Sequence, residues 1–146
     1  MTKEILVEQM KTILGTNFGL YFKMHSFHWN IEGVDFVQYH EFLGDLYTSV
    51  WEQTDSIAEN IRKLDSYAPT ALSRMLELSD VEENTNIPSA LEMLRELLND
   101  NERFIVHLRA GIVAADNANE PAIGNFLQDL LDKHQKHSWM LRSITK

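Results

Sequence analysis

Cysteine is absent from this chain of 146 residues, and glycine and proline are scarce. Without cysteine there are no disulfides and no thiolate ligands, so a metal site would have to use other donors. The 6 glycines and 3 prolines favour a compact, mostly helical protein. No apolar run approaches the roughly 18 residues that a membrane span needs. The N-terminal residues lack the apolar block of a signal peptide, so we expect a cytoplasmic protein with no membrane partner.

Basic residues are also in deficit. The chain has 13 Lys and Arg against 22 Asp and Glu, which gives a formal net charge of −9. Broad nucleic-acid binding requires clustered Lys and Arg, and only Lys3 and Lys11 lie in the first dozen residues. DNA is therefore not an expected partner. An acidic surface would instead attract cations.

Apolar residues recur every three or four positions along four stretches, which predicts an all-α protein with helices of roughly 25–30 residues. The predicted helices run from a cap at Thr2 to about Ile31, from near Asp35 to Leu64, from a first turn containing Pro88, and from Pro121. The connection over 65–87 is long. It contains an apolar stretch at 71–78 that predicts a short helix, and an acidic stretch at 80–83 that we expect to be solvated. One long crossover is typical of a ferritin-like four-helix bundle, here as a single domain over residues 1–146.

Four residues could carry metal chemistry. Asp55 and Glu59 are four positions apart on the second predicted helix, so they share a face. Like charges at this spacing repel by roughly 0.2–0.5 kcal/mol, and a cation would relieve that repulsion. His28 and His40 lie upstream, and imidazole and carboxylate together are ligands suited to iron or zinc.

The distances along the chain indicate how such a site could be built. In a continuous helix at roughly 1.5 Å per residue, His40 and Asp55 would lie about 22 Å apart and could not bind one ion. The turn that follows His28 would bring it near His40. Two copies packed antiparallel about a two-fold axis near Tyr47 and Thr48 would join the histidines of one chain to the carboxylates of the other. We therefore expect any metal centre to lie between subunits.

Each of these residues also has a simpler interpretation. Asp55 and Glu59 could lie on a solvated helix face, with Arg62 or Lys63 paired to Glu59. A lone histidine on an apolar stripe, such as His28, is more often a core residue with satisfied hydrogen bonds. No Glu-x-x-His sequence occurs in the chain, which argues against the di-iron site that larger ferritins build within one bundle.

The spacing of these residues resembles that of the Dps family, the mini-ferritins named as DNA-binding proteins from starved cells. The resemblance also covers the whole four-helix pattern and the C-terminal tryptophan. It is carried by His28-Trp29-Asn30, Gly33, Phe36, His40-Glu41, Asp55 and Glu59, and by Trp139. The resemblance implies a hollow homododecamer with ferroxidase centres at its two-fold interfaces.

By position, the resemblance assigns His28 as a primary iron ligand, with Asp55 and Glu59 coming from the partner chain. His40 corresponds to a ligand of a second, weaker iron position. The implied activity is that of a ferroxidase, which oxidises Fe(II) with hydrogen peroxide or O2 and stores ferric mineral in the cavity. This reaction would protect against oxidative damage. Zinc could compete for the same ligands, and Trp29 beside the site could take up an oxidising equivalent.

The sequence departs from the family pattern in two places. Gly44 stands where the family often has an acid four residues after His40, so we expect a weakened second iron position. The sequence also shows no lysine-rich tail of the kind that DNA-binding members use. The alternative function is a DNA-protecting shell protein with weak or lost ferroxidase activity. Acidic pores are further implied near the start of the fourth helix, with Asp116, Glu120 and Asp129 as candidates.

Overall fold

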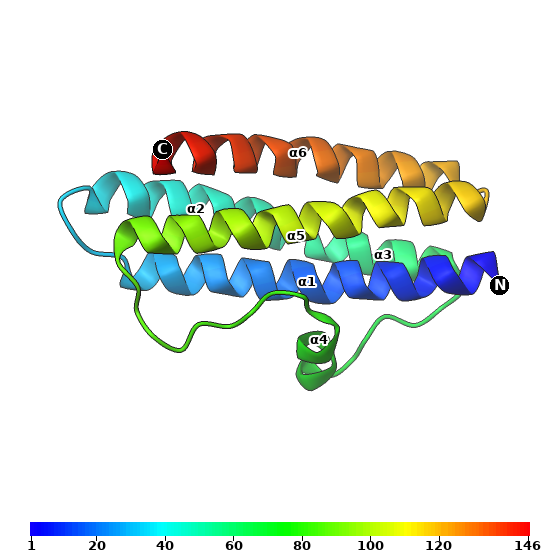
Figure 1. Cartoon of the computed structure of the whole chain (residues 1–146). Helices are drawn as coiled ribbons and strands as arrows, with labels where there is room; N and C mark the ends of the chain where they lie inside the picture. Colours follow the sequence, from blue (N-terminus) through cyan, green and yellow to red (C-terminus); the bar gives the residue numbers. More distant parts are fainter.

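The computed structural model describes residues 1–146 and contains six helices and no strands. The helices are α1 (Thr2–Asn30), α2 (Phe36–Glu52), α3 (Thr54–Lys63), α4 (Leu72–Leu78), α5 (Ala90–Asn117) and α6 (Pro121–Thr145). Helices α1, α5 and α6 form a four-helix bundle with α2 and α3, which lie end to end (Figure 1). The short α4 packs against α1 within the long crossover. The predicted ferritin-like bundle with an extra helix between its second and third long helices is confirmed.

The helix boundaries follow local capping chemistry. Helix α6 begins at Pro121, as predicted, because proline is well suited to the first helical position. Helix α5 begins at Ala90 rather than at Pro88, because the Ser89 hydroxyl accepts a hydrogen bond from the Glu92 N–H (3.4 Å). One continuous cluster of buried apolar side chains fills the bundle. None of the helices is both long enough and apolar enough to cross a membrane.

The second predicted helix is interrupted at Gln53, between α2 and α3. The side-chain amide of Asn17 donates to the Val50 carbonyl (3.1 Å) and to the Thr54 hydroxyl (3.0 Å). A side chain inserted into the helical hydrogen-bond ladder is a common cause of such a break. The prediction of one unbroken helix to Leu64 is therefore wrong. Because α3 continues along the line of α2, it still leads away from the turn between α1 and α2 (Figure 1).

Gln53 also takes part in a buried polar network at the centre of the bundle. Its amide donates to Asn17 Oδ1 (2.8 Å) and to His134 Nε2 (2.7 Å). His134 Nδ1 donates to Asn101 Oδ1 (2.6 Å), and the Asn101 amide donates to the Ser138 hydroxyl (2.7 Å). This pattern fits only a neutral His134 whose proton is on Nδ1.

Acid is expected to destabilise the bundle through His134 and His137. Burial lowers the pKa of His134 well below its ordinary value, and burial lowers the pKa of His137 to about 4. The unfolded chain therefore binds more protons than the folded chain. The resulting stability is present above a pH of about 6.5 and is lost as the pH falls towards the folded values. For His137 alone, the free energy of unfolding near pH 5 should be about 2 kcal/mol lower than its value above a pH of about 6.5.

Denaturant unfolding of the wild type and of His137→Gln, near pH 7.5 and near pH 5, measures this effect. The substitution should reduce the pH dependence of the unfolding free energy. Equal pH dependence in the two proteins would contradict the assignment to His137.

A buried ion pair joins the crossover to the bundle. Lys23 in α1 is 7% exposed and lies 2.8 Å from a carboxylate oxygen of Asp100 in α5. Its ammonium also donates to the Glu82 carbonyl (2.8 Å) and lies 3.5 Å from Glu96. Desolvation raises the pKa of Asp100, against the opposing effect of the Lys23 ammonium. Lys23 thus links α1, α5 and the crossover.

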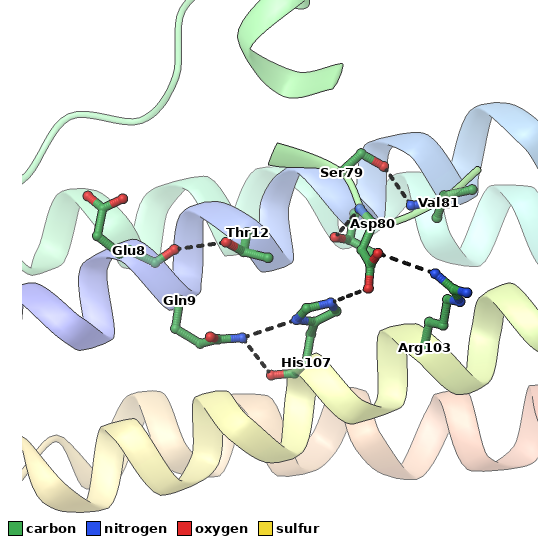
Figure 2. Close-up of polar contacts among 9 residues, drawn as sticks. Glu8, Gln9, Thr12, Ser79, Asp80, Val81, Arg103 and His107 are labelled. Atoms are coloured by element: carbon green, nitrogen blue, oxygen red, sulfur yellow. Dashed lines mark hydrogen bonds and ion pairs between the residues drawn. The ribbon is translucent and has the colours of Figure 1, made fainter. Parts of the chain in front are cut away.

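A second polar cluster holds the crossover near Asp80 (Figure 2). His107 Nε2 lies 2.8 Å from one oxygen of the Asp80 carboxylate, and Arg103 pairs with the other oxygen at 3.4 Å. The Asp80 N–H donates to the Thr16 hydroxyl (3.1 Å), and Gln9 donates to the His107 carbonyl (3.1 Å). The expectation that the acidic stretch is merely solvated is wrong for Asp80. No periodic pattern in the sequence pointed to its partner His107.

Replacing Asp80 with asparagine is expected to loosen the crossover while the bundle stays folded. The ion pairs of Asp80 are partly exposed, so the free energy of global unfolding should fall by only about 0.2–1 kcal/mol. Amide hydrogen exchange around residues 79–81 should become several-fold faster, because local opening needs less free energy. Glu82→Gln is the matched control, since it makes the same charge change where the side chain forms no ion pair. Equal exchange in both variants would contradict a role for the Asp80 cluster.

Candidate metal centre

His28 and His40 face each other across the turn between α1 and α2. Gly33 in this turn has φ 124°, a backbone conformation that favours glycine. The two imidazole rings stack with their centroids 3.7 Å apart and their planes inclined by 15°. The structure therefore brings together the two histidines that the sequence singled out.

Reciprocal hydrogen bonds fix the two rings. His28 Nδ1 donates to the His40 carbonyl (2.6 Å), and His40 Nδ1 donates to the His28 carbonyl (2.8 Å). A carbonyl only accepts, so each neutral ring carries its proton on Nδ1 and has a lone pair on Nε2. No protein group is hydrogen-bonded to either Nε2. Histidines that bind metals commonly use this arrangement, in which the second ring nitrogen is held by a backbone carbonyl.

Gly44 lies one helical turn after His40 and directly against the His28 ring. A Cβ atom at this position would lie 3.3 Å from His28 Cε1 and 3.5 Å from its Nδ1. The glycine therefore gives the ring space and supplies no side-chain ligand. An acid at this position would press on the His28 ring.

Aromatic side chains extend from the histidine pair along the α1–α2 interface. The Tyr47 ring lies 5.1 Å from the His28 ring and stacks on His25 at 3.8 Å with an interplanar angle of 8°. The Tyr21 hydroxyl lies 2.9 Å from His25 Nδ1, and the Trp51 ring lies 4.9 Å from the Tyr21 ring. Burial, and secondarily the neighbouring His28, lower the pKa of His25.

Sequence reasoning gave no functional role to the two tyrosines of this layer. Tyr21 precedes His28 by seven residues, and Tyr47 follows His40 by seven residues. Two helical turns place each tyrosine on the same face as its histidine, so this spacing was the available signal. Trp29, which the sequence placed beside the site, is 56% exposed and lies 4.3 Å from the His25 ring.

Asp55 and Glu59 are exposed on one face of α3 and form no ion pair or hydrogen bond. The alternative interpretation paired Glu59 with a nearby cation. Arg62 instead donates to the Ser66 carbonyl (2.8 Å) and lies over the Tyr67 ring at 4.7 Å. The two carboxylates are thus left without a cationic partner inside the chain.

The histidines and the carboxylates are not brought together within one chain. No three His, Asp or Glu side chains gather closely enough to hold a metal ion. The carboxylates lie on α3, whereas His28 lies near the end of α1 and His40 near the start of α2. The turn between α1 and α2 is at the end of α2 away from α3 (Figure 1). One chain therefore presents a histidine half and a separate carboxylate half.

The acidic residues that were suggested as pore candidates lie at the end of the bundle away from the histidine pair. Asp116 is exposed at the end of α5, and Asp129 is exposed on α6. Glu120 precedes α6 and shares with Glu59 and Lys63 the wall of a cavity of about 270 Å³. This cavity connects the start of α6 with the carboxylate face of α3.

Comparisons with known proteins agree with this fold. The ferritin family model, for a ferritin-like domain, matches residues 7–146. "DNA protection during starvation protein 2" of Bacillus anthracis is 31% identical over 125 residues, which are 86% of each chain. The "DNA protection during starvation protein" of Brevibacillus brevis is 32% identical over 125 residues, 86% of this chain and 84% of that protein.

Solved structures of Dps proteins and related proteins have the same fold as this chain. A Dps protein from Bacillus brevis superposes with a TM-score of 0.95 at 28% identity, over 99% of this chain and 97% of that chain. Antigen TpF1 from Treponema pallidum has a TM-score of 0.95 at 29% identity, over 99% of this chain and 94% of that chain. With its family match, sequence relatives and bundle geometry taken together, the chain belongs to the ferritin-like family, among the Dps proteins.

Proposed function

We propose that this protein is a mini-ferritin that detoxifies and stores iron. It binds Fe(II) at centres between subunits, oxidises it with hydrogen peroxide or O2, and keeps the ferric product inside a hollow homododecamer. The observation that carries this proposal is the stacked histidine pair, with both Nδ1 atoms held by backbone carbonyls and both Nε2 atoms free. Membership of the ferritin-like family supports iron as the metal.

The proposed centre combines two halves from two subunits. His28 and His40 of one subunit would face Asp55 and Glu59 of the partner subunit. A two-fold contact of this kind creates two equivalent centres per interface. Mixed imidazole and carboxylate ligands suit iron, and zinc could compete for them.

The ring geometry favours two ions per centre. Because the two ring planes are nearly parallel, their Nε2 lone pairs do not converge on one point, so each histidine would bind its own ion. Each Fe(II) supplies one electron, and reduction of one peroxide to two waters consumes two electrons and two protons. A pair of ions therefore disposes of peroxide without releasing hydroxyl radical. Gly44 adds no side-chain ligand to the centre. From the family resemblance, the more weakly held ion would be the one at His40.

Acidic groups offer a path for iron to the centre. In this proposal Asp116, Glu120 and Asp129 attract Fe(II) electrostatically near the start of α6. The cavity that Glu120 shares with Glu59 would then lead the ion towards the carboxylate half.

DNA is the competing partner that the names of the relatives suggest. This chain has a net charge of −9, and counterion release from DNA needs clustered cations. We therefore propose metal oxidation rather than DNA protection by binding. Gel retardation at low and at physiological salt separates the two, because weak electrostatic association disappears as salt rises.

Sedimentation velocity after addition of Fe(II) and peroxide tests the proposed function. Ferric absorbance should travel with a particle of about twelve times the 16.9 kDa chain mass. A particle of that mass with iron precipitating separately would favour a shell without ferroxidase activity. A monomer or dimer without iron would overturn the proposal.

A further inference from the structure

We propose that Tyr21 donates an electron to the centre when only one Fe(II) is bound, while its phenolic proton passes to His25. This inference rests on the proposed function. It assigns a redox role to a side chain that does not touch the iron, and it follows from the aromatic layer behind the histidine pair.

The need for a further electron arises from the weaker half of the centre. Gly44 packs against the His28 ring and supplies no side-chain ligand to the centre. When only one of the two iron positions is filled, one Fe(II) supplies one electron, whereas conversion of peroxide to two waters requires two. Without a second donor, cleavage of the O–O bond would release a hydroxyl radical beside the protein.

A continuous set of ring contacts connects Tyr21 to the iron-binding histidines. The ring centroids of His28 and Tyr47 are 5.1 Å apart, and those of Tyr47 and His25 are 3.8 Å apart. Tyr21 lies 6.1 Å from Tyr47 and 5.6 Å from His25. Along the route from Tyr21 through Tyr47 to His28, the ring centroids are no more than 6.1 Å apart. An electron can therefore pass from Tyr21 to the centre through side chains that are in or near van der Waals contact.

Proton transfer distinguishes Tyr21 from the other tyrosines. A tyrosine gives up an electron readily only when its phenolic proton can leave at the same time. The Tyr21 hydroxyl lies 2.9 Å from His25 Nδ1, within the range for direct proton transfer, and the Nε2–H tautomer of His25 makes Nδ1 the acceptor of the phenolic proton. The hydroxyls of Tyr39, Tyr47 and Tyr67 form no hydrogen bond with the protein. Tyr47 is nearer to the centre, but it lacks this proton acceptor.

The proposed step balances. Fe(II) and Tyr21 each lose one electron, and the O–O bond of hydrogen peroxide breaks. The phenolic proton moves to His25 Nδ1, and the peroxide oxygens take up two protons from solvent to form two waters. A ferric ion, a neutral tyrosyl radical and a protonated His25 remain.

Freeze-quench electron paramagnetic resonance on the assembled protein tests this step. One Fe(II) per chain is added without O2, followed by peroxide, in protein that carries ring-deuterated tyrosine for assignment. The wild type should form a tyrosyl radical. Tyr21→Phe should reduce it several-fold and should raise the yield of spin-trapped hydroxyl radical. His25→Phe keeps an aromatic ring on Tyr47 but removes the proton acceptor, and it should also lose the signal.

Tyr67→Phe is the matched control, because Tyr67 is 80% exposed and lies outside the aromatic layer. It should keep the wild-type signal. An undiminished tyrosyl radical in Tyr21→Phe, or a tryptophanyl radical alone in the wild type, would overturn the inference. Iron oxidation by the wild type at two Fe(II) per chain is measured in parallel. Its absence would overturn the proposed function itself, so the two failures are distinguishable.

Discussion

His28→Ala is expected to slow the initial oxidation of Fe(II) by more than about 100-fold. Changes to groups that only orient a metal ligand already cost about 10–100-fold, and this substitution removes a proposed ligand itself. It also removes the donor to the His40 carbonyl and the ring that stacks on His40. Stopped-flow absorbance of the ferric product, at equal protein and iron concentrations, measures the effect.

His107→Ala is the control for this experiment. His107 lies on α5, where its ring contacts Asp80 and the side chain of Gln9 rather than the histidine pair (Figure 2). This variant should oxidise iron at the wild-type rate. Wild-type kinetics in His28→Ala would exclude His28 as a ligand, provided that sedimentation shows an intact shell for both variants.

Lys23→Met should lower the free energy of unfolding by about 3–5 kcal/mol. The substitution leaves the Asp100 carboxylate buried without its cation, and burial already raises the pKa of this group. It also removes the hydrogen bond to the Glu82 carbonyl. The midpoint of denaturant unfolding, compared at matched protein concentration, measures the loss.

The double variant Lys23→Met, Asp100→Leu separates the cost of an orphaned charge from the value of the pair. Replacement of a buried ion pair by apolar residues is often nearly neutral, so most of the lost stability should return. Equal loss in the single and double variants would contradict the explanation by an unpaired carboxylate. Unchanged stability in Lys23→Met would contradict the importance of the ion pair.

The bundle could be predicted because its determinants are local. Apolar residues at helical spacing, the proline at position 121 and the long middle connection all act within short stretches of sequence. The break at Gln53 could not be predicted, because it arises from the Asn17 amide on another helix. The contact between Asp80 and His107 could not be predicted either, because these residues are 27 positions apart and come together only when the crossover folds back.

The candidate centre was predictable in its residues but not in its geometry. The spacing of His28 and His40 around a turn predicted that they would meet. The protonated nitrogen of each ring depends on the backbone carbonyl beside it, and that carbonyl belongs to the other helix and meets the ring only in the folded chain. Tyr21 and His25 are one helical turn apart on α1, so their contact could be expected from the sequence. The connection from these two residues to the centre through Tyr47 depends on how α1 packs against α2.

Co-assembly of two inactive variants tests the shared centre most directly. His28→Ala and Asp55→Ala chains are dissociated, mixed in equal amounts and reassembled. An interface between unlike chains would regain one intact centre, with His28 from one chain and Asp55 from the other. Random pairing across two-fold interfaces then predicts about a quarter of the wild-type rate of Fe(II) oxidation. A mixture as inactive as either variant alone would contradict a centre built between subunits.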